Sequence, residues 1–173
     1  PLDPGMMRIT THWPKTSPAT ADDLDSHLYI PYSGCSGGSD KDDKCHLWFM
    51  AVQTVTGYVN YTGVRTRVYH IYGGDTSDYV TLDQDDTDPP GQETMTISKV
   101  RSGVYSYSVK NYSDKGDNLS QSGSTILKKS RAKVKLYYND GTKLYRKKFH
   151  VPNDNGTLWR VFTFDKDASG PFT

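Results

Sequence analysis

Short runs of alternating apolar and polar residues are the feature that most constrains how this chain folds. In Gly103–Tyr112, valine and serine positions alternate with tyrosine positions, which is the period-two pattern of a half-buried strand. Ala132–Val151 is the clearest hairpin, because Asp140-Gly141 at its centre suits the positive φ angles of a tight turn. Similar runs recur along the chain and no helical period is evident. The pattern predicts an all-β chain of about nine strands.

These strands predict one β-sandwich, immunoglobulin-like in style, with a barrel as the alternative. A length of 173 residues suits one domain. We expect an N-terminal extension over 1–7, the sandwich over 8–165 and a tail over 166–173.

No apolar run approaches the roughly 20 residues of a membrane-spanning helix, so no membrane span is expected. The absence of an initial Met and of an apolar leader suggests that Pro1 begins a mature or trimmed chain.

The charge is strongly segregated although the net charge is only +1. The segment from Asp75 to Glu93 contains seven acids and no base. The segment from Lys128 to Lys148 contains nine bases and one acid. A general nucleic-acid binder is basic overall, so a nucleic-acid partner is not expected. The segregation predicts an acidic site and a basic face on the same domain.

The only two cysteines, Cys35 and Cys45, flank a loop of glycine, serine and charged residues. A Cys35–Cys45 disulfide that closes this loop in an oxidising compartment is the simplest interpretation. The alternatives are two free thiols or, with His46, a zinc site, although no CxxC spacing is present.

Asparagine is rare in this chain and is concentrated in glycosylation sequons. Four of the six asparagines open an N-x-Ser/Thr sequence without a central proline. A bacterial surface domain with accidental sequons is the alternative to a secreted glycoprotein. We predict an extracellular or cell-surface protein with N-glycosylation at Asn60, Asn111, Asn118 and Asn155.

Acidic residues gather at two strand ends. Asp23, Asp25 and His27 alternate at the start of one expected strand, so they share a face. Leu82–Asp88 is the second acidic group, and Glu93 opens the strand that follows it. Clustered carboxylates in flexible loops suit Ca²⁺, which takes six to eight oxygen ligands; a solvated acidic loop is the alternative. The predicted ligands are Asp23, Asp25, Asp83, Asp85 and Glu93.

These same motifs carry a family resemblance. Asp23-Leu24-Asp25-Ser26-His27 and Leu82-Asp83-Gln84-Asp85-Asp86, the latter followed by Gly91-Gln92-Glu93, resemble paired motifs of β-sandwich domains in secreted and cell-surface proteins, sometimes described as carboxypeptidase-regulatory-like. The resemblance runs from about residue 8 to residue 165 and implies a fold without an assigned catalytic activity. The chain departs from the motif at Gln92, where proline is usual, and in the Cys35–Cys45 insertion.

Three classes of function are open at this point. We expect first a calcium-stabilised structural or adhesive module of a coat or fibre. A calcium-dependent carbohydrate-binding module comes second, because 13 Tyr and 3 Trp offer stacking platforms. A hydrolase comes last: His27 is the best catalytic candidate, but no nucleophile elbow, HExxH or P-loop motif is present.

Self-association is the partner that we expect for a structural module. Residues 1–7 contain three apolar side chains that could add to a neighbour's sheet by strand addition, and such head-to-tail contacts generate filaments. The alternative is that both tails are frayed. The basic segment Lys128–Lys148 could also meet the acidic segment Asp75–Glu93 of the next copy.

Overall fold

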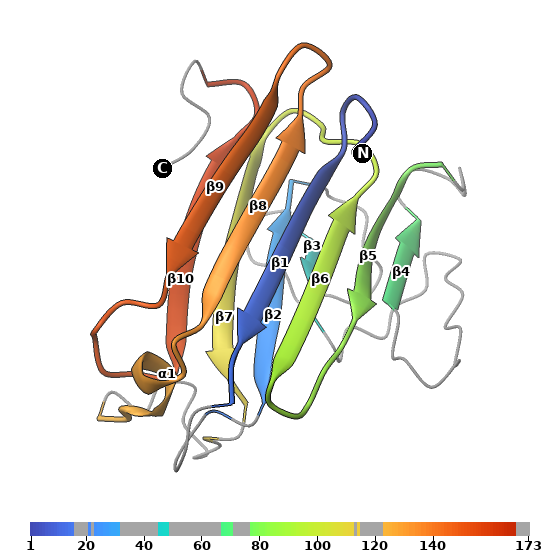
Figure 1. Ribbon diagram of the computed structural model, residues 1–173. Coiled ribbons are helices and arrows are strands. Elements are labelled where there is room, and N and C mark those ends of the chain that lie inside the picture. Colours follow the sequence, from blue (N-terminus) through green and yellow to red (C-terminus); the bar gives the residue numbers. More distant parts are fainter. Residues whose placement is uncertain are drawn as a thin grey trace.

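The computed structural model describes residues 1–15, 21, 23–31, 45–48, 67–70, 77–112, 114 and 123–168. The described residues form ten strands and one short helix (Figure 1): β1 Met7–Trp13, β2 Leu24–Ile30, β3 Cys45–Leu47, β4 Arg67–His70, β5 Tyr79–Gln84, β6 Gly91–Ile97, β7 Val104–Asn111, α1 Ile126–Lys129, β8 Lys133–Asn139, β9 Leu144–His150 and β10 Leu158–Asp165.

The strands form two sheets that pack face to face, so the predicted all-β sandwich is confirmed. The larger sheet, sheet A, has the order β4-β5-β6-β1-β8-β9, and the smaller one, sheet B, has the order β10-β7-β2-β3. All described pairings are antiparallel. Sheet A faces the viewer in Figure 1, with sheet B behind it.

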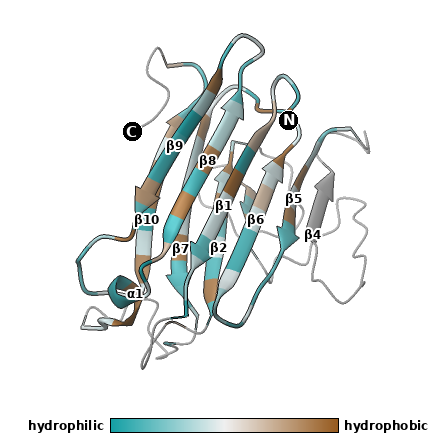
Figure 2. Cartoon of the chain, in the orientation of Figure 1, coloured by the Kyte–Doolittle hydropathy of each residue, from teal (hydrophilic) through white to brown (hydrophobic). Residues whose placement is uncertain are grey.

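The core lies between the sheets and follows the predicted alternation. In β1 the buried positions Met7, Ile9 and Trp13 alternate with more exposed ones, and Figure 2 shows the resulting hydrophobic and hydrophilic bands along β1 and β8. Sheet B contributes mainly aromatic and aliphatic side chains, among them Tyr107 and Phe164. Tyr105 and Tyr107, which lie two positions apart on β7, both point into this core.

Gly91 allows the largest core side chain to lie flat at one end of sheet A. Gly91 pairs with Trp13 across β6 and β1. A Cβ atom built on Gly91 would overlap the indole ring of Trp13. Because Gly91 follows the acidic loop at once, this close packing also fixes where that loop joins β6.

The predicted hairpin is confirmed as β8 and β9. Lys133 pairs with His150, and the register runs without a shift to Asn139 and Leu144. Gly141 has a φ of +96°. The Asp140 carboxylate accepts hydrogen bonds from the amides of Thr142 and Lys143, both at 2.7 Å, and these bonds lower the pKa of Asp140 to about 2.

Residues within the predicted extension 1–7 are hydrogen-bonded to their own chain. The Gly5 amide donates to the Asn139 carbonyl at 2.7 Å, and the Asn139 amide donates to the Met6 carbonyl at 3.0 Å. Met7 already belongs to β1 and is fully buried. A strand exchange through residues 1–7 would have to break these bonds, so this segment is not a free arm.

Two smaller features differ from the sequence prediction or extend it. The one-turn helix α1 was not predicted, because four residues are too short to show a helical period. In the tail that was expected to begin at 166, the Lys166 amide donates to the Gly103 carbonyl at 3.1 Å. Among the described residues, no helix has the length and apolar character needed to cross a membrane.

Candidate functional site

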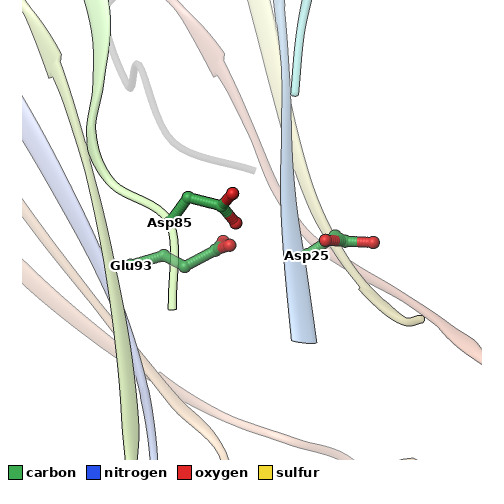
Figure 3. A group of neighbouring side chains, drawn as sticks. All are labelled: Asp25, Asp85 and Glu93. Atoms are coloured by element: carbon green, nitrogen blue, oxygen red, sulfur yellow. The ribbon is translucent and has the colours of Figure 1, made fainter. Parts of the chain in front are cut away.

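Three carboxylates from both sheets meet near one end of the sandwich. Asp25 lies on β2, Asp85 follows β5 and Glu93 lies on β6. One carboxylate oxygen of each lies within 4.8 Å of the others. Figure 3 shows Asp85 and Glu93 extending toward β2, the strand that carries Asp25. Three carboxylates supply up to six oxygens, which suits a hard cation such as Ca²⁺.

Glu93 crosses the space between the sheets. Its side chain is only 1% exposed, and its Oε2 accepts a hydrogen bond from the Ser26 amide at 2.6 Å. The described pairing of β2 with β3 begins at Leu28. Ser26 precedes this point, and its amide donates to Glu93 and not to a described residue of β3. The Glu93 Oε1 is buried and has no hydrogen-bond partner among the described residues.

A chain of buried hydroxyls surrounds this carboxylate. The Tyr107 hydroxyl donates to Ser26 Oγ at 2.6 Å and lies 2.6 Å from Thr11 Oγ1. Thr11 pairs with Glu93 across β1 and β6, and Ser26 Oγ also donates to Thr11 Oγ1 at 3.3 Å. Two residues of each sheet are thereby joined by polar contacts inside an otherwise apolar core. The sequence prediction missed Thr11 and Tyr107, whose only signal was that polar groups occupy core positions.

The electrostatics of the cluster disfavour a bare negative charge. Burial raises the pKa of Glu93 well above its ordinary value, the Ser26 hydrogen bonds oppose that rise, and the charges of Asp25 and Asp85 add to it. A buried carboxylate next to like charges must therefore hold a proton or meet a cation. A divalent ion at this point would favour the ionised form and reverse the direction of the shift.

The structure brings together three of the five predicted ligands, namely Asp25, Asp85 and Glu93. Asp83 points to the outer face of sheet A, where it accepts hydrogen bonds from the hydroxyls of Thr81 and Thr96, the latter at 2.6 Å. Asp23 precedes β2, and its carbonyl accepts a hydrogen bond from the Tyr112 amide at 3.0 Å. Neither belongs to the described acidic cluster, and their role as ligands stays a prediction.

Three of the described acids of the segment 75–93 are engaged within their own chain. Asp78 is buried and forms an ion pair with Arg101. Glu93 is in the core and Asp83 is held by two threonines. These three carboxylates face other groups of their own chain; a contact of this segment with a basic segment of another copy stays a prediction.

A stack of rings lies on the outer face of sheet B. The Tyr29 and His46 rings are 4.1 Å apart and nearly parallel, and Trp48 stacks on His46 at 5.5 Å. His27 Nδ1 lies 2.8 Å from His46 Nε2. Because His27 and Tyr29 alternate on β2, and His46 and Trp48 alternate at β3, each pair shares a face. The pairing of Tyr29 with His46 brings the two pairs together.

These rings form one wall of a groove of about 790 Å³. The floor is β7, whose residues Ser106, Ser108 and Lys110 face outward between buried ones. The other wall is β10, where a bulge between Arg160 and Phe162 changes the direction in which the side chains point. The groove thus combines ring faces, hydroxyls and two cations, Lys110 and Arg160.

The two histidines of the stack remain neutral near pH 7. Burial, followed by the charges of neighbouring His46 and Lys110, lowers the pKa of His27 to about 3. Burial also lowers the pKa of His46 to about 4. These side chains therefore act in the groove as neutral rings and not as cations.

The residues predicted for covalent modification have different surroundings. Asn155 is exposed, as glycosylation requires. Asn111 is only 1% exposed and both polar atoms of its side chain are buried, which opposes a glycan there; its glycosylation stays a prediction. Asn60, Asn118 and Cys35 lie outside the described residues. Cys45 is buried, and no described cysteine is a free thiol; the Cys35–Cys45 bridge stays a prediction.

Comparison with known proteins supports the fold alone. No family model matches the chain, and no curated protein matches it either. The chain is similar to a solved structure described as the crystal structure of unknown function protein SAV2460, with a TM-score of 0.50 and 16% sequence identity. The alignment covers 97% of this chain and 84% of that chain. The carboxypeptidase-regulatory-like resemblance stays a sequence-based expectation.

Proposed function

We propose that this chain is a non-enzymatic module of an extracellular glycoprotein, in which a calcium ion bound by Asp25, Asp85 and Glu93 holds the two sheets together. Its role in this proposal is structural or adhesive, as a building block of a surface coat or fibre. The observation that carries the proposal is Glu93, a carboxylate 1% exposed with one oxygen on the Ser26 amide and the other without a described partner.

The position of the cluster explains what the ion would do. Glu93 and Asp85 belong to the sheet A side of the molecule, whereas Asp25 and Ser26 belong to sheet B. An ion between them would link two layers that otherwise meet mainly through apolar contacts. Such an ion stabilises the folded state by mass action, because the unfolded chain has no preformed site.

Self-association remains part of this proposal, although not through residues 1–7. Strand β9 lies at one edge of sheet A and carries exposed Arg146, Lys147 and Lys148, and charged side chains of this kind oppose strand addition. Of the described edges of sheet B, β10 begins with the exposed Leu158. Contacts between copies are therefore expected at sheet B and not at β9.

The proposal is tested by thermal unfolding and sedimentation of the purified chain. Unfolding is followed in EDTA and then in increasing CaCl₂, with MgCl₂ at equal ionic strength as a control. We expect a melting temperature that rises with Ca²⁺ concentration, and association at high protein concentration. Identical melts in EDTA and Ca²⁺ would contradict the cation site. A strictly monomeric chain in Ca²⁺ would contradict the assembling role and leave the cation site intact.

Carbohydrate binding is a second candidate function, and the groove on sheet B is the observation that favours it. Its volume lies in the range of about 300–1,000 Å³ that is common for small-ligand sites. Aromatic faces such as Trp48 offer stacking surfaces, while Ser106 and Ser108 offer hydroxyls. A glycan array with wild type and Trp48→Ala tests this candidate: binding that Trp48→Ala abolishes supports it, and no binding to any glycan rejects it.

A further inference from the structure

The outer face of sheet A carries a concentrated array of cations at β8 and β9. Lys133 and Lys135 occupy alternating exposed positions of β8, so both point away from the core. Lys148 lies directly opposite Lys135, Arg146 lies opposite Tyr137, and His150 lies opposite Lys133. On β1, next to β8, Arg8 pairs with Tyr137 and His12 with Lys133. We call the residues Arg8, His12, Lys133, Lys135, Arg146, Lys148 and His150 the basic face.

This arrangement reduces the stability of the sheet that carries it. Like charges directly opposite each other on neighbouring strands repel, and Lys135 and Lys148 form such a pair. Lysines on an edge strand have a simple explanation, because they prevent another chain from adding a strand to the sheet. That explanation covers β9 but not β8 and β1, which lie inside sheet A. The inner part of the basic face therefore needs another explanation.

The geometry of the array matches a linear polyanion. Residues on the same face of a strand lie about 6.6 Å apart along the strand, and neighbouring strands are about 4.8 Å apart. The backbone positions of Lys133, Lys135 and Lys148 therefore form a grid with about this spacing. Figure 2 shows hydrophilic colour over much of β9 and in bands along β8.

We propose that the basic face binds a linear sulfated polysaccharide, with Lys135 and Lys148 at the centre of the contact. Sulfate groups along such a chain would neutralise the repulsion between the two lysines. A nucleic acid is less suited, because a general nucleic-acid-binding domain has a pI above about 9 whereas this chain has a pI of about 8.2 and a net charge of +1. The inference depends neither on the cation site nor on the groove.

The test uses Lys148→Glu, because its effects on binding and on stability go in opposite directions. The substitution replaces a repulsive cross-strand pair by an attractive one, so the melting temperature should stay equal or rise. Binding of a heparin octasaccharide, measured by isothermal titration calorimetry in CaCl₂, should weaken at least tenfold. Lys99→Glu makes the same charge change at an exposed position in the β6–β7 turn, and it should change affinity less than threefold.

Two further ligands decide the class of partner. Fully desulfated heparin octasaccharide should bind at least tenfold more weakly than heparin, and wild-type affinity should fall steeply with NaCl concentration because exposed charges are screened. No heparin binding, or equal loss in Lys148→Glu and Lys99→Glu, would overturn the proposal. Double-stranded DNA of similar charge that binds as tightly as heparin would also overturn it, in favour of general polyanion binding.

Discussion

Glu93→Gln separates the charge of Glu93 from its shape and gives the sharpest test of the cation site. Glutamine keeps a carbonyl oxygen that can accept the Ser26 amide hydrogen bond, which is 2.6 Å long in the wild type. It removes the anionic ligand and the buried negative charge. The variant should therefore lose the response to calcium without losing the fold.

The size of the calcium effect follows from mass action. A ligand at a hundred times its dissociation constant stabilises the folded state by about 2.7 kcal/mol. For a chain of this length, each kcal/mol moves the melting temperature by roughly 2–4 °C. The wild type should then melt about 5 to 10 °C higher in saturating Ca²⁺ than in EDTA, and Glu93→Gln should show a shift close to zero.

The pH dependence in EDTA gives an independent readout of the same carboxylate. The pKa of Glu93 is raised in the folded state above its ordinary value of 4.5. The folded chain therefore binds this proton more tightly than the unfolded chain, so its contribution to stability is present below pH 4.5 and is lost as the pH rises toward the folded pKa. Glu93→Gln cannot titrate, so in EDTA above pH 4.5 its melting temperature should exceed that of the wild type, whereas in Ca²⁺ the order should reverse.

The controls are Asp88→Asn, which removes an exposed acid of the same loop, and Asp83→Asn, which removes a carboxylate of the outer face. Both should keep a calcium shift of wild-type size, measured by differential scanning fluorimetry and confirmed by calorimetry. A wild-type-sized calcium shift in Glu93→Gln would refute the reasoning, because the ion would then be bound elsewhere.

Three further predictions concern packing, acid stability and glycosylation. Gly91→Ala should lower the free energy of unfolding by about 1–3 kcal/mol in a urea titration, because its Cβ would overlap the Trp13 ring; an unchanged midpoint would contradict this packing. For His27, the pKa difference between 6.5 and about 3 gives stability that is complete above pH 6.5 and is lost as the pH falls, by roughly 3–5 kcal/mol in total. His27→Asn should therefore lose less stability than the wild type between pH 7 and 4 in thermal melts, and parallel pH curves would oppose this account. Mass spectrometry of natural material should find a glycan at Asn155 and none at Asn111; a glycan at Asn111 would contradict the burial of that side chain.

The strand pattern could be predicted because it depends on local alternation. The β8–β9 hairpin shows this most clearly, since Asp140 and Gly141 determine the turn and the alternation in β8 determines which face is buried. Pairing between distant strands could not be predicted in the same way. The contact of His27 with His46 depends on the register of β2 with β3, for which neither strand carries a local signal.

The acidic cluster was predicted in part, and a single bulge explains the difference. Strict alternation places Asp83 and Asp85 on the same side of a strand. The register of β5 against β6 shifts between Leu82 and Gln84, so an extra residue is inserted at this point. Asp83 then faces outward to Thr81 and Thr96, while Asp85 turns inward to Glu93. Sequence alternation alone cannot show where such a bulge occurs.

Strand β2 connects the proposed cation site with the groove. Asp25 contributes to the acidic cluster, and the Ser26 amide holds Glu93. The next residue, His27, stacks on His46 in the groove wall. Because consecutive strand residues share one backbone, an ion that fixes Asp25 and Glu93 would also fix the position of His27 relative to β6. A calcium dependence of ligand binding in the groove would then arise without any contact between the ion and the ligand, through the position of β2 alone.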